Sequence, residues 1–156
     1  KCKDGVIYTS PLRRCKETAE ILSNSLSFPV KVKKELVEIN FGIFEGLSID
    51  EARKKYPGIF LAREKDKWNF RIPKGESYKD GYIRLLKFLN EIRNEQFKCI
   101  IVVTHATMMK LFLVHFLNLS VKEVQRFVFK PLSVLEFKII NDNAMEAFLD
   151  GKKINL

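Results

Sequence analysis

The hydrophobic and polar residues of the chain follow two periods, one typical of strands and one typical of helices. Short runs of β-branched and apolar residues, as at 99–103, have the length and composition of strands buried on both faces. Apolar residues spaced three and four apart indicate amphipathic helices, and we expect Cys15, Ala19, Ile21 and Leu22 on the inner face of one of them. Strands are predicted at 6–9, 30–34, 99–103, 133–140 and 144–149, and helices at 12–25, 48–56, 78–97, 107–117 and 121–126.

Glycine, proline and capping residues mark the boundaries of these segments. Ser10 can cap the first helix, because Pro11 after it fits the first helical turn. Asn141, Asp142 and Asn143 have the composition of a hairpin turn between the last two strands. The intervening stretch 35–47 contains Gly42 and Gly46 and is predicted to be an irregular loop.

The order of these segments predicts an α/β fold, a three-layer sandwich with a mostly parallel central sheet. A length of 156 residues with 46% hydrophobic residues suits a single domain over residues 1–156 with a core of its own. No apolar run is long enough to cross a membrane and no signal peptide is visible, so we expect no membrane partner. The cysteines are odd in number and widely spaced, which favours reduced thiols in a cytoplasmic protein without a metal site or cofactor.

A formal charge of +9 favours anionic partners. The lysines and arginines fall in short scattered groups rather than along one helix with exposed aromatic residues. A nucleic-acid partner is therefore not expected, and a small phosphorylated substrate is. The mostly apolar C-terminal half is compatible with a homodimer.

Two strand-to-helix junctions carry side chains suited to a phosphoryl group. His105 follows the strand at 99–103, and Arg14 lies in the first turn after the strand at 6–9. Arginine offers paired donors to phosphate oxygens, and a helix start adds free backbone N–H groups. A histidine in such a position can also have a purely structural role. Because Arg14 is expected at the same edge of the sheet, the two residues together favour a functional site. Glu38, in the irregular loop, could donate a proton to a leaving alkoxide if it is held protonated.

Four motifs in the same order resemble the histidine phosphatase superfamily, which includes phosphoglycerate mutase and acid phosphatases. Residues 8–22 read YTSPLRRCKETAEIL, residues 35–48 read ELVEINFGIFEGLS, residues 73–77 read PKGES, and residues 102–113 read VVTHATMMKLFL. The second of these is similar to the loop Leu-x-Glu-x-x-x-Gly-x-x-Glu-Gly of that family. The resemblance implies a phosphoglycerate mutase-like fold.

The resemblance also implies a role for each matching residue. Arg14 would be a phosphate-binding arginine, Glu38 the proton donor and His105 the second catalytic histidine, with the backbone N–H of Ala106 also on phosphate. The family usually has glycine where this chain has Ala106. Glu45, Glu76 and His115 are expected to be structural, with His115 packed in a helix.

The family's Arg-His-Gly motif, which supplies the nucleophilic histidine at the end of its first strand, is missing. The two histidines of this chain, His105 and His115, both come late. We therefore expect the first strand of the sheet to be missing from this chain, which alone would be inactive. The implied activity of the complete protein is a metal-independent phosphomonoesterase that forms a phosphohistidine. Alternatives are a phosphoglycerate mutase, disfavoured by the short stretch 46–75, and a non-catalytic phosphate-binding remnant.

Overall fold

A computed structural model describes residues 3–141 and 144–155 of the chain. Its strands are β1 (Gly5–Thr9), β2 (Val30–Val32), β3 (Cys99–Val103), β4 (Leu135–Asn141), β5 (Ala144–Leu149) and β6 (Lys152–Lys153). Its α-helices are α1 (Arg13–Leu26), α2 (Ile49–Lys55), α3 (Pro57–Lys65), α4 (Tyr78–Ile92) and α5 (Ala106–Leu117). Short 3₁₀ turns lie at Lys34–Leu36, Gly42–Phe44 and Glu123–Arg126.

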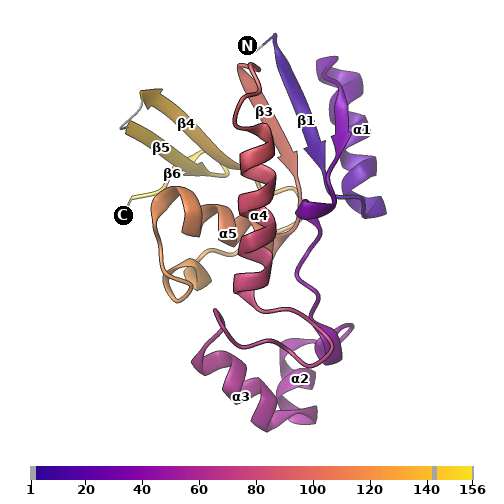
Figure 1. The fold of residues 1–156 in the computed structure, drawn as a ribbon, viewed down its shortest axis with the longest axis vertical. Helices are drawn as coiled ribbons and strands as arrows, with labels where there is room; N and C mark the ends of the chain where they lie inside the picture. The colour runs from indigo at the N-terminus through magenta and orange to yellow at the C-terminus, as the bar shows by residue number, and fades with distance from the viewer. Residues whose placement is uncertain (1–2, 142–143, 156) are drawn as a thin grey trace.

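Three parallel strands in the order β2-β1-β3 form the central sheet. Helix α1 covers one face, where Ala19 packs with Ile7 and Phe28. Helices α4 and α5 cover the other face, where Leu85 and Leu111 pack with Tyr8 (Figure 1). The expected α/β fold with helices on both faces of a parallel sheet is thus confirmed.

The C-terminal strands form a second, antiparallel sheet in the order β4-β5-β6. The expected hairpin turn includes Asp142 and Asn143, which lie outside the described residues. Leu135 and Phe137 of β4 pack against the same core cluster as Val102 of β3. Within the described ranges, however, β3 pairs only with β1, and β4 only with β5. Each of these two strands therefore has one edge without a partner strand among the described residues.

Helices α2 and α3 form a small cap at one end of the molecule (Figure 1). The cap has its own apolar cluster around Phe44, Ala52 and Ile72. Pro57 ends α2 and starts α3, because proline at the first position of a helix needs no hydrogen-bond partner for its nitrogen.

Three local predictions were wrong. Ile21 is 67% exposed instead of facing the core, whereas Leu22, which was also expected to face inward, does pack against the core. Helix α4 ends at Ile92 and not at residue 97. Ser10 does not cap α1, whose N-cap is Leu12 without a side-chain hydrogen bond. The side chain of Ser10 is instead directed to His105.

Candidate active site

The carboxyl ends of β1 and β3 bring Arg14 and His105 together. The two strands are in register, with Thr9 opposite Val103, so the residues that follow them emerge at the same edge of the sheet. Nη2 of Arg14 lies 3.0 Å from Nδ1 of His105. The sequence prediction that both residues belong to one location is consistent with this contact.

The imidazole of His105 is buried, and both of its nitrogens have polar contacts. Nε2 lies 2.9 Å from Oγ of Ser10 and 3.6 Å from Sγ of Cys15. Burial, followed by the positive charges of Arg14 and Arg84, lowers the pKa of His105 to about 4. The ring is therefore neutral at pH 7. Since the Arg14 guanidinium can only donate, Nδ1 accepts and Nε2 carries the proton that it donates to Ser10.

Glu38 contacts the same helix start. Its Oε2 accepts a hydrogen bond from the backbone N–H of Thr107 at 3.1 Å, and its Oε1 accepts from Ile39 N–H at 3.0 Å. Burial raises the pKa of Glu38, although these backbone hydrogen bonds act in the other direction. Ala106, between His105 and Thr107, is exposed in the first turn of α5, where backbone N–H groups have no partner within the helix.

A cavity of about 620 Å³ opens between the cap and α5. Arg63 and Lys67 line it from the cap side, and Lys110 lines it from α5, one turn after Ala106. Burial lowers the pKa of Lys110, and the charges of Lys67 and Arg63 lower it further. The guanidinium of Arg63 lies 5.8 Å from the ring centres of both Phe41 and Tyr78, which hold it against the cavity wall.

Several contributors to this region were not predicted from the sequence. Ser10 and Cys15 contact His105, but the sequence suggested only a capping residue and a core residue. The cavity was missed because Lys110 lies more than forty residues along the chain from Arg63 and Lys67. Glu64 lines the same cavity and forms ion pairs with Arg63 at 3.1 Å and with Lys67 at 3.0 Å. As expected, Glu45 orders its loop, accepting from Phe41 N–H at 2.7 Å. His115 packs within α5 as expected, but it also has a partner, the hydroxyl of Tyr82 at 3.2 Å.

The described residues contain neither a cluster of metal ligands nor a membrane-spanning helix. Over residues 3–141 and 144–155, no group of three or more His, Cys, Asp or Glu side chains could hold a metal ion. Among those same residues, no helix has the length and apolar character needed to cross a membrane.

A parallel sheet with an arginine and a neutral histidine at its strand ends, and a glutamate from a loop at the adjacent helix start, suits the binding of a phosphate ester. The chain matches the family described as histidine phosphatase superfamily, branch 1, over residues 1–148. The chain belongs to this family.

Curated relatives include bisphosphatases. The chain is 35% identical over 118 residues to 6-phosphofructo-2-kinase/fructose-2,6-bisphosphatase of Gallus gallus, which covers 76% of this chain and 24% of the relative. It is 32% identical over 117 residues to fructose-2,6-bisphosphatase of Saccharomyces cerevisiae, covering 75% of this chain and 25% of the relative. The chain thus spans about a quarter of the length of these relatives.

Solved structures share the fold. YhfR of Bacillus stearothermophilus aligns with a TM-score of 0.75 at 26% identity, over 94% of this chain and 73% of that one. A putative α-ribazole-5′-P phosphatase of Escherichia coli aligns with a TM-score of 0.76 at 19% identity, over 97% of this chain and 76% of that one. The second likeness concerns the fold alone.

Proposed function

We propose that this chain forms part of a metal-independent phosphomonoesterase whose reaction passes through a phosphohistidine. The observation that carries this proposal is that Glu38 and His105 both lie at the start of α5, where Glu38 accepts from Thr107 N–H and Arg14 contacts the histidine. Arg14, His105 and the backbone N–H of Ala106 would hold the phosphoryl oxygens, which carry negative charge throughout the transfer.

The proposed reaction has two steps. A histidine nitrogen attacks phosphorus, the bond from phosphorus to the leaving oxygen breaks, and Glu38 gives its proton to that oxygen. Water then attacks the phosphohistidine and gives a proton to the Glu38 carboxylate, the phosphorus–nitrogen bond breaks, and inorganic phosphate leaves. The raised pKa of Glu38 supports the acid role, because more of the carboxyl is protonated near neutral pH than at an exposed glutamate.

The attacking histidine is assigned to a further strand between β3 and β4. Neither His105, which is already held by Arg14 and Ser10, nor His115, at the far end of α5, is placed for this role. Strand β1 is buried throughout, whereas the apolar strand β3 is only partly covered, with Ile100 38% exposed. A strand inserted there would pair with both open edges and join the two sheets.

The substrate is proposed to be a small metabolite with a second anionic group, such as a sugar bisphosphate. Arg63, Lys67 and Lys110 line one cavity, together with Glu64, which pairs with Arg63 and Lys67. An anion beside Lys110 would counteract the burial and the charges of Lys67 and Arg63 that lower the pKa of this lysine. The names of the curated relatives, which specify a fructose 2,6-bisphosphatase, agree with this chemistry.

Glu38→Gln tests the acid role. Since an amide cannot give a proton, the variant should lose about 100-fold in kcat on an alkyl phosphate such as glycerol phosphate. The loss on p-nitrophenyl phosphate should be much smaller, because its leaving group needs little protonation. Steady-state kinetics on both esters, measured in EDTA, gives the comparison. Equal losses on the two esters would exclude Glu38 as the proton donor.

Lys67→Met tests the second anion site. The variant should raise KM for fructose 2,6-bisphosphate by about tenfold, since it removes a charged donor to the phosphate that does not react. Turnover of p-nitrophenyl phosphate, which lacks that group, should hardly change. Lys65→Met is the matched control, because Lys65 is a lysine two residues before Lys67, at the end of α3, and lies outside the cavity lining. Similar KM changes for both substrates, or in both variants, would contradict the proposed subsite.

A further inference from the structure

The backbone around Glu38 is held mainly by side chains rather than by a neighbouring strand. In the described part of the chain, residues 37–41 belong to no helix or strand. Carbonyl groups here therefore need other partners. The carbonyl of Leu36 accepts from Oγ1 of Thr104 at 2.8 Å, which ties this segment to the residue preceding His105.

Arg84 supplies partners for two more of these carbonyls. Its Nη1 donates to the carbonyl oxygen of Glu35 at 2.8 Å and to that of Val37 at 2.9 Å. Arg84 lies in the middle of α4, between the buried residues Gly81 and Leu85, so packing of the helix in the core fixes the backbone position of Arg84. One guanidinium thus grips the chain immediately before Glu38.

Glu76 grips the chain on the other side of Glu38. Its Oε2 accepts from the backbone N–H of Asn40 at 2.9 Å, and its own backbone N–H donates to the carbonyl of Asn40 at 2.8 Å. The carboxylate also receives Nε and Nη2 of Arg84 at 3.1 and 3.0 Å, a two-pronged ion pair. Arg84 and Glu76 are therefore one unit with contacts on both sides of Glu38.

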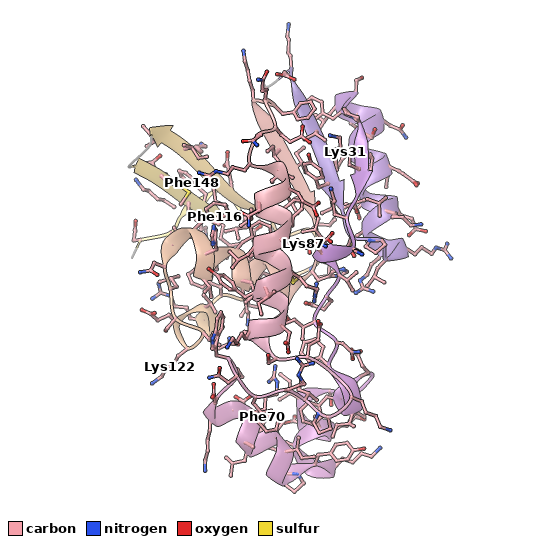
Figure 2. All side chains as sticks on the ribbon, in the orientation of Figure 1. Lys31, Phe70, Lys87, Phe116, Lys122 and Phe148 are labelled. Carbon is pink, nitrogen blue, oxygen red and sulfur yellow. The ribbon has the colours of Figure 1, made fainter. Side chains whose placement is uncertain are left out.

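We infer that the Arg84–Glu76 pair positions Glu38 for proton transfer, so that both act as positioning residues for the phosphatase reaction. The inference rests on the proposed acid role of Glu38. A planar guanidinium is needed, since four acceptors are bound in fixed directions, and lysine cannot reproduce them. Two other contacts would still hold the chain before Glu38 if this pair were removed: the hydrogen bond from Thr104 to Leu36 and the ion pair of Lys87 with Glu35 at 3.3 Å. Lys87 projects from α4, the helix that also carries Arg84 (Figure 2).

Arg84→Lys and Glu76→Gln, made in the enzyme as expressed from its own reading frame, test this inference. Both variants keep the approximate size of the side chain, and a thermal melt of each identifies loss of folding. A displaced Glu38 should lower kcat on glycerol phosphate by about tenfold or more, and on p-nitrophenyl phosphate by less than about threefold. Adding Arg84→Lys to Glu38→Gln should cause little further loss on glycerol phosphate, because the group being positioned is already gone.

Arg71→Gln is the matched control. It breaks the ion pair of Arg71 with Asp80 at 2.6 Å, which lies beside the same turn but holds no part of residues 35–40. Any loss of kcat in this variant should be similar for glycerol phosphate and p-nitrophenyl phosphate.

Different results contradict different claims. If Glu38→Gln shows the dependence on leaving group and neither Arg84→Lys nor Glu76→Gln does, the positioning role is wrong and the acid role stands. Uniform losses on both esters in these two variants, or full additivity with Glu38→Gln, would equally reduce the pair to a structural role. If Glu38→Gln itself lacks that dependence, the acid role fails and the positioning role fails with it.

Discussion

At the scale of single residues, the position of His105 could be predicted and its surroundings could not. The change from a β-branched run to an apolar helix pattern placed the histidine at a strand-to-helix junction. Its contacts with Ser10, Arg14 and Cys15 join residues about ninety positions apart, which no local pattern encodes. The neutral state of the ring depends on burial and on these contacts, and it could therefore not be predicted from the sequence.

His105 should make the stability of the fold depend on pH. Its pKa is about 4 in the folded chain against 6.5 for the free side chain, so between these values the unfolded state binds a proton that the folded state does not. The contribution of His105 to the free energy of unfolding should be fully present above pH 6.5 and should decrease as the pH falls toward 4. Between pH 7 and pH 4.5 the loss from this residue is roughly 2 to 3 kcal/mol.

Urea unfolding of the protein and of His105→Gln at these two pH values measures the effect. The difference between the two proteins separates His105 from the carboxyl groups, which titrate in the same range. A difference in unfolding free energy that does not change with pH would contradict the buried, neutral imidazole.

At the scale of elements, regular segments were predicted better than irregular ones. Strand β3 and helices α1 and α5 appear within one or two residues of their expected bounds, because their apolar periods match the packing that they make. The stretch 35–47 was expected only to be irregular. Its path is set by Thr104, Glu76 and Arg84, which lie far along the chain and bind backbone groups rather than forming a periodic pattern.

The close approach of two turns could also not be read from the sequence. Gly42 has a φ of +52°, and a side chain there would collide with the carbonyl oxygen of Pro73. The expected irregularity at Gly42 is thus correct, but its cause is contact with the turn 73–77. This contact brings Glu76 beside the segment that carries Glu38.

At the scale of the whole molecule, the fold class and family were predicted, and the division into two sheets was not. Sheets β2-β1-β3 and β4-β5-β6 share a core through Val102, Leu135 and Phe137. Among the described residues, however, no hydrogen-bonded strand pair connects the two sheets. The positive charge, scattered along the sequence, gathers in part on one cavity through Arg63, Lys67 and Lys110. Both features support an anionic metabolite and a further strand that completes the site.

The measurement that tests the central claim most directly is the trapping of a phosphoenzyme. The protein expressed from its own reading frame is incubated in EDTA with ³²P-labelled substrate, quenched in alkali and mapped, alongside residues 1–156 alone. We expect acid-labile label on a histidine outside residues 1–156 together with turnover, and no turnover from residues 1–156 alone. Turnover without any labelled histidine, or phosphate binding with no turnover by the protein from its own reading frame, would contradict the proposed phosphatase.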